Sequence, residues 1–163
     1  MNWDAIGALG EIVGATAVVL TLVYLASQVR YAKSATLDQG RITRSNAVCE
    51  MVLATASDDV LREGQMRDWG IQNYYEELGS ELGISSTEAS RNDWANVYYF
   101  WVHWGQWKCT NDEKDLEELE NIITTMYGLP GMRRSWDISP VGKALLEPNF
   151  VAYVDGILND SLG

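Results

Sequence analysis

The chain has 163 residues and a formal net charge of −11, with 12 Lys and Arg against 23 Asp and Glu. This acidic balance excludes the extended basic face that nucleic-acid phosphates require, so nucleic acid is not expected among the partners. One histidine and two cysteines also exclude zinc sites built from several His or Cys and a di-iron bundle with two Glu-x-x-His motifs, so we expect no metal and no cofactor.

Residues 5–27 form an apolar segment, AIGALGEIVGATAVVLTLVYLAS, in which Glu11 is the one charged side chain. As a helix with a rise of about 1.5 Å per residue, the segment reaches about 35 Å and crosses a hydrocarbon core of about 30 Å. No Lys or Arg precedes it, unlike the basic start of a cleaved signal peptide. We therefore expect an uncleaved transmembrane anchor over residues 1–30, embedded in the lipid bilayer.

Basic residues follow this segment and predict its orientation. Arg30, Lys33, Arg41 and Arg44 are opposed over that stretch only by Asp38. Because loops rich in Lys and Arg stay on the cytoplasmic side, the N-terminus should lie outside and the C-terminal part in the cytoplasm.

Small residues recur along one face of the predicted anchor, at steps of three and four residues. They are Gly7, Gly10, Gly14, Ala17 and Thr21. Membrane helices associate by close backbone approach and hydrogen bonds, and Gly10 and Gly14 match the small-xxx-small pattern. This stripe predicts an interface with another transmembrane helix, from a second copy or a larger complex. The alternative is that Gly and Ala are simply common in membrane helices.

Glu11 lies beside this stripe and is a candidate intramembrane polar site. A carboxylate within lipid costs a few kcal/mol unless it is paired, protonated or in reach of water. It could make an interhelical hydrogen bond or carry a proton. Alternatively, the span begins at Ile12 and Glu11 lies at the wet interface; residues 12–29 still suffice to cross.

Residues 31–163 should form an acidic, Trp-rich domain, and its first predicted helices are separated by short breaks. A helix over residues 31–56 has its weakest point at Gly40. Ser57, followed by two aspartates, predicts the N-cap of a helix over residues 58–69. A third helix over residues 71–82 should be broken by Gly79 and Gly83.

The most distinctive part of this domain is a predicted helix over residues 87–108. Ser85 and Glu88 match a capping box at its start. Large side chains then recur at helical spacing: Trp94, Val97, Tyr98, Trp101, Trp104 and Trp107. We expect this face to form the centre of the core. The alternatives are a partner surface or a ligand pocket built by Trp94, Tyr98, Trp101, His103 and Trp107.

The remaining residues also have helical patterns, so the predicted fold is all-α: a single N-terminal transmembrane helix continuing into a cytoplasmic helical bundle. Asp112 should cap a helix that ends at the Gly128–Gly131 turn. Its apolar face comprises Leu116, Leu119, Ile122, Ile123 and Met126. Short helical pieces over residues 132–136 and 140–146 precede a last helix after Pro148.

No catalytic residues are predicted, because nucleotide-binding, hydrolase and metalloprotease motifs are absent. His103 could meet Cys109 or Ser135 in space, but a packed, hydrogen-bonded histidine is the favoured interpretation. The two cysteines should be reduced in the cytoplasm.

Both ends of the chain resemble a family of small bacterial proteins with one N-terminal membrane helix. The resemblance covers MNWDAIGALGEIVGATAVVLTLVYLASQVR closely and PGMRRSWDISPVGKALLEPNFVAYVDGIL loosely. It implies a protein of the bacterial inner membrane with a helical soluble domain. It supplies no activity and no functional residues.

Two functions follow from these observations. The first is a membrane-anchored, non-catalytic interaction or structural protein, either a homo-oligomer or an accessory subunit of a respiratory or photosynthetic type of complex. The second is a small-molecule sensor or enzyme with a pocket in the Trp-rich bundle.

Overall fold

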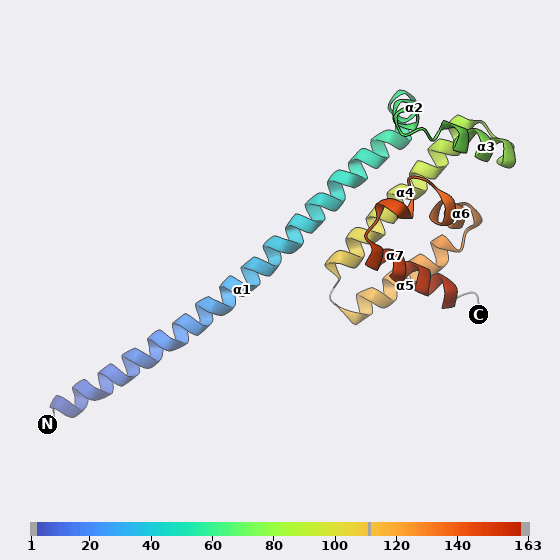
Figure 1. Ribbon diagram of the computed structural model, residues 1–163. Coiled ribbons are helices and arrows are strands. Elements are labelled where there is room, and N and C mark those ends of the chain that lie inside the picture. The colour runs from blue at the N-terminus through green and yellow to red at the C-terminus, as the bar shows by residue number, and fades with distance from the viewer. Residues whose placement is uncertain (1–2, 111, 161–163) are drawn as a thin grey trace. The chain divides into compact units, whose positions relative to one another are not determined.

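The computed structural model describes residues 3–110 and 112–160, and this part of the chain is helical without strands (Figure 1). Its elements are α1 (Trp3–Ser57), α2 (Asp59–Asp68), α3 (Gln72–Leu82), α4 (Ser86–Cys109), α5 (Glu113–Tyr127), α6 (Pro130–Ile138), the 3₁₀ helix η1 (Lys143–Leu145) and α7 (Pro148–Asp160). The prediction of an all-α chain is confirmed. By its internal contacts the chain divides into two units, residues 1–40 and 41–163.

The first unit consists of the N-terminal part of α1, which is apolar and exposed. Ile12, Val18, Leu20 and Val23 each keep more than half of their surface open. Among the described residues, α1 is the one helix long and apolar enough, by length and composition, to cross a membrane. Gly40 lies inside α1 and does not end the helix, although the division between the two units falls directly after it.

In the second unit, a buried arginine joins the end of α1 to α2 and α4. Arg62 has no exposed surface. Its Nη1 donates to the carbonyl oxygens of Thr55 at 3.3 Å and Ala56 at 3.0 Å, and its Nε donates to Ser90 Oγ at 2.9 Å. Nη2 forms an ion pair with Asp59. The guanidinium thus satisfies carbonyls that the last turn of α1 leaves open, at the negative end of the helix dipole.

The predicted cap of the following helix is one residue too early. Asp58, and not Ser57, is the N-cap of α2, and its carboxylate accepts from the Leu61 amide at 3.0 Å. Ser57 is the last residue of α1, where its hydroxyl donates to the Leu53 carbonyl at 2.8 Å. Consecutive residues with cap-forming side chains compete for this role, and the backbone of Asp58 is extended as a cap requires.

Helix α3 ends as predicted at Gly83, which has a left-handed φ of 68°. The prediction of a break at Gly79 is wrong, because α3 runs through it. Gly79 is needed for packing instead: a Cβ there would lie 2.9 Å from the Ile84 carbonyl oxygen and 3.0 Å from the Ser86 amide nitrogen. The glycine lets the chain turn back closely over α3 and enter α4.

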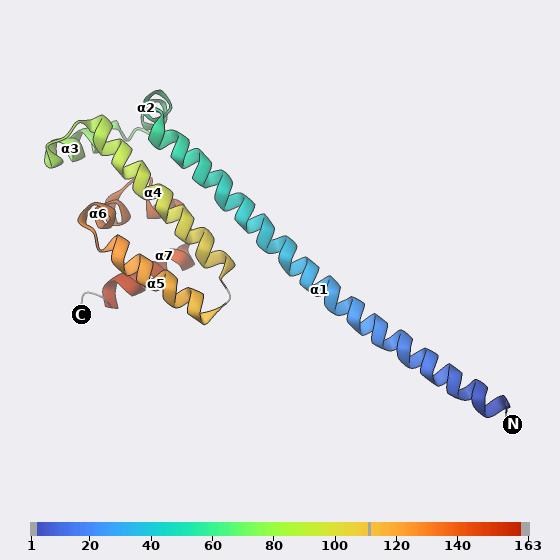
Figure 2. The ribbon, with the colours of Figure 1, turned by 180° about the vertical axis from the view of Figure 1, so that it is seen from behind.

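Helix α4 is the centre of the second unit. Its capping box is present, with Ser85 and Glu88 bonded reciprocally. Figures 1 and 2 show α3 against its first turns and α5, α6 and α7 beside it. Phe100 lies in a cluster of buried rings, with centroids 5.2 Å from Tyr127 and 5.1 Å from Trp136. The aromatic segment therefore supplies the middle of the core, but its central ring, Phe100, lies outside the predicted face, and Tyr98, Trp101 and Trp107 of that face are only partly buried.

The C-terminal helices complete this core. Asp112 caps α5 as predicted by accepting from the Lys114 amide at 2.8 Å. Leu119 and Ile123 of the predicted apolar face are buried, whereas the fully buried Tyr127 was not anticipated. Helix α7 begins at Pro148 and buries Phe150, Val154 and Leu158.

Candidate functional site

The predicted helix–helix interface is open in the described part of the chain. A Cβ placed on Gly7, Gly10 or Gly14 would meet no atom within 4 Å. The Thr21 hydroxyl donates to the Ala17 carbonyl at 2.8 Å, so it is satisfied within the helix. Ala17, Thr21 and Glu11 are all exposed. The stripe is thus available to a neighbour.

The aromatic residues singled out on α4 lie in several separate contacts and do not line one site. Trp94 is buried and its ring lies 5.8 Å from that of Trp69. Trp107 contacts Phe150 at 5.6 Å. Trp101 makes an edge contact with Trp104 at 5.4 Å, and Tyr98 makes one with Tyr99 at 5.5 Å. Their distribution is that of core packing on several sides of one helix.

His103 is a packed histidine with one ring contact to α5. It is buried, and its Nδ1 lies 3.2 Å from the Tyr127 hydroxyl. Burial lowers the pKa of His103 to about 4, so the imidazole is neutral at pH 7. Of the two residues proposed to meet it, Ser135 instead accepts from Asn96 Nδ2 at 2.8 Å.

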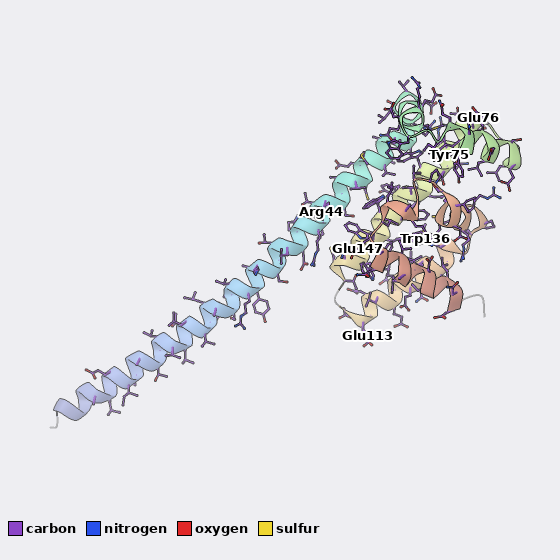
Figure 3. All side chains as sticks on the ribbon, viewed as in Figure 1. Arg44, Tyr75, Glu76, Glu113, Trp136 and Glu147 are labelled. Atoms are coloured by element: carbon purple, nitrogen blue, oxygen red, sulfur yellow. The ribbon has the colours of Figure 1, made fainter. Side chains whose placement is uncertain are left out.

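A polar cluster that the sequence analysis missed centres on Asp93 of α4. The residue is only 2 % exposed. Its Oδ2 accepts from the hydroxyls of Tyr75 on α3, at 2.8 Å, and of Ser139, which follows α6, at 2.6 Å. Figure 3 shows Tyr75 beside α4. By distance and angle, its other oxygen, Oδ1, accepts no hydrogen bond in the described part of the chain, although the Ser135 hydroxyl lies close enough to lower the pKa of the carboxyl.

Burial raises the pKa of Asp93, and the nearby hydroxyls of Ser135, Ser139 and Tyr75 act in the opposite direction. Both hydrogen-bonded partners of Oδ2 are neutral groups, and no ion pair compensates this carboxylate among the described residues. Buried charges are normally paired, so Asp93 stands out as a site with an unfilled requirement.

Asp93 lines a pocket of about 210 Å³ between α3, α4 and α6. The lining residues are Leu78, Leu82, Ala89, Asn92, Asp93, Asn96, Pro130, Gly131, Arg134 and Ser135. Nη2 of Arg134 donates to Glu81 Oε1 at 2.8 Å, whereas its buried Nη1 has no partner in the described chain. One pocket therefore brings together an unfilled acceptor and an unfilled donor.

One sequence signal could have found this site. Asp93 lies four residues after Ala89 and four before Val97, both of which are buried, so the apolar face of α4 contains a carboxylate. Trp residues at neighbouring positions dominate the helical pattern, so Asp93 was not singled out. Arg134 has no comparable signal, because its position depends on the packing of α6 onto α4.

The chain matches no protein-family model, no curated protein and no solved structure. Within the described residues, no group of three or more His, Cys, Asp or Glu side chains could hold a metal ion.

Proposed function

We propose that this chain is a membrane-anchored, non-catalytic interaction or structural protein that acts as a homo-oligomer or as an accessory subunit of a larger membrane complex. The single observation that carries the proposal is the exposure of the apolar N-terminal part of α1. In the 18-residue apolar window of this helix, 0 % of the residues are buried. A helix that is apolar all round requires an apolar environment, and contiguous exposed apolar surface marks a membrane or protein contact.

Lipid is favoured as this environment by the length of the apolar segment and by the residues that follow it. Leu20, Leu22 and Val23 are exposed on different sides of the helix, whereas a partner groove would require one apolar face. Arg30, Lys33, Arg41 and Arg44 then favour a cytoplasmic second unit and an outward N-terminus, as in the bacterial inner membrane.

Association through the small-residue stripe is the second part of the proposal. The stripe is supported by the open space at Gly7, Gly10 and Gly14. Without a hydrophobic gain in lipid, close approach of two backbones is what holds helices together, and glycines permit it. Glu11, next to the stripe, would then lie at or near the contact.

Two measurements test the proposal. Membranes from cells expressing the chain are washed with alkaline carbonate, and the protein should remain in the pellet. The complex extracted in mild detergent is then weighed by native mass spectrometry. Gly10→Leu with Gly14→Leu should release the partner helices, while the control pair Ala15→Leu and Ala26→Leu, which the 3.6-residue repeat places away from the stripe, should leave the complex intact. A protein that washes off the membrane contradicts the anchor.

The alternative, a sensor or enzyme with a pocket in the Trp-rich bundle, has less support. Trp94 is 2 % exposed and His103 is 4 % exposed, and both contact other aromatic rings. A ligand retained among these residues in the same mass spectra would favour it.

A further inference from the structure

The pocket between α3, α4 and α6 lacks partners for two of its polar atoms. Asp93 Oδ1 is an acceptor on a residue that is 2 % exposed, and Arg134 Nη1 is a buried donor. Both residues line the same cavity. Buried polar atoms are usually hydrogen-bonded in native proteins, so both atoms are available to a bound group.

The two atoms require groups of opposite character. The hydroxyls beside Asp93, which belong to Tyr75, Ser139 and Ser135, are all neutral, so a positively charged donor would supply the missing counter-charge. Arg134 donates through Nη2 to Glu81, and its Nη1 requires an acceptor. A carboxylate oxygen is a suitable acceptor for the N–H groups of this charged nitrogen.

The rest of the pocket wall is largely apolar. Leu78, Ala89 and Pro130 line it beside the charged residues. Its volume of about 210 Å³ lies below the range of about 300–1,000 Å³ that is usual for ligand pockets. This space admits a small molecule with a short aliphatic part and excludes a nucleotide or a large cofactor, whose pockets are larger.

The geometry points to a binding site for a small zwitterion, a free amino acid with an aliphatic side chain, whose ammonium group binds Asp93 Oδ1 and whose carboxylate binds Arg134 Nη1. The side chain would lie against Leu78 and Ala89. This site goes beyond the proposed membrane role and is independent of the anchor, since its residues all belong to the second unit.

Isothermal titration calorimetry on the full-length protein in mild detergent tests the site, with L-leucine and L-valine as probes. At least one should bind saturably. N-acetyl-leucine lacks the ammonium group and leucinamide lacks the carboxylate, so each should bind about tenfold or more weakly than leucine, the loss expected for a charge-assisted hydrogen bond. These analogues test the recognition without altering the protein.

Substitutions then assign the two ends of the ligand. Asp93→Asn and Arg134→Gln should each weaken binding by about tenfold or more. Asp137→Asn and Arg133→Gln are matched controls, because these residues form an ion pair with each other at 2.7 Å and are not part of the pocket wall. The controls should bind as the parent does, and circular dichroism verifies that every variant is folded.

Three results would overturn the inference. Absence of binding by both amino acids to the folded parent protein would show that the pocket does not take an aliphatic amino acid. Equal binding of leucine and either analogue would show that the site does not recognise both charged groups of a zwitterion. Parent-like binding by folded Asp93→Asn and Arg134→Gln would place the amino acid elsewhere.

Discussion

The two units of this chain contain the same secondary structure but differ in what can stabilise it. In residues 7–40, the apolar side chains face outward, and within the described residues the helix has no core of its own. In residues 41–163, Phe100, Trp136 and Phe150 have no exposed surface. An apolar helix can thus be covered by protein interior, as in the second unit, or by lipid, as proposed for the first, and the position of the polar residues decides which.

The largest expected effect comes from charging the N-terminal unit. Val18→Arg with Leu20→Arg should move the protein from the carbonate-resistant membrane pellet to the supernatant, because each arginine near the middle of a span costs about 3 kcal/mol, or about 6 kcal/mol together. The control pair Val18→Ala and Leu20→Ala should stay in the pellet. If the arginine pair also remains in the membrane, lipid is not what covers this helix.

Truncating Trp136, a central ring of the second unit, should destabilise this unit without affecting membrane association. Trp136 has no exposed surface and its Nε1 donates to Asp155 Oδ1 at 2.7 Å, so Trp136→Ala should lower the free energy of unfolding by about 4 kcal/mol. The effect is measured by urea denaturation in detergent, and membrane association should not change. Trp69→Ala is the control, because Trp69 is 49 % exposed and should cost far less. Equal losses for both would contradict the assignment of the core.

A pH series tests the neutral, buried state of His103. Its pKa is about 4 in the folded protein against an ordinary value of 6.5, so the unfolded state binds more protons between these values. The stability that His103 contributes is complete above about pH 6.5 and is lost as the pH falls through 4, by up to about 3 kcal/mol.

Urea denaturation of His103→Gln from pH 7 to pH 4 isolates this contribution, since glutamine does not titrate. The substitution should flatten the fall in stability. Asp93 acts with the opposite sign: its raised pKa gives stability that is present at low pH and lost as the pH rises above its unfolded value of about 3.8. Comparing parent and variant at each pH removes that contribution. Parallel curves would mean that the imidazole is solvated.

The smallest expected effects come from replacing two helical glycines of the second unit, Gly79 and Gly64, by alanine. Gly79→Ala should destabilise the unit by about 1–3 kcal/mol, because the new methyl group would meet the backbone at Ile84 and Ser86. Gly64→Ala, inside α2 with nothing within 4 Å, should stabilise it by about 1 kcal/mol through helix propensity. Thermal unfolding measures both. Equal signs would show that the close approach at Gly79 is not needed.

Most of the correct predictions about the fold come from short sequence patterns. The capping box of Ser85 and Glu88, the left-handed Gly83 and the start of α7 at Pro148 all depend on a few neighbouring residues, and sequence contains that information. The burial of Arg62 and the role of Gly79 depend on segments that meet only after folding. For this reason the burial of Arg62 was not predicted, and the prediction of a helix break at Gly79 is wrong.

The sites divide in the same way. The small-residue stripe can be written down from spacing alone, and its contact with another helix stays a prediction. The pocket at Asp93 required the approach of α3 and α6 to α4, which periodicity does not specify. The one sequence signal for this pocket is the carboxylate of Asp93 on the apolar face of α4, where aromatic residues dominate the pattern.

The buried guanidinium of Arg62 has a consequence for how the second unit opens. It binds carbonyls at the end of α1, a carboxylate in the first turn of α2 and a hydroxyl in the first turns of α4. Arginine keeps its charge at all accessible pH values, so fraying any one of these ends strands a permanent cation. The three ends should therefore melt as one cooperative block, and their amide protons should exchange with solvent deuterium at a common rate.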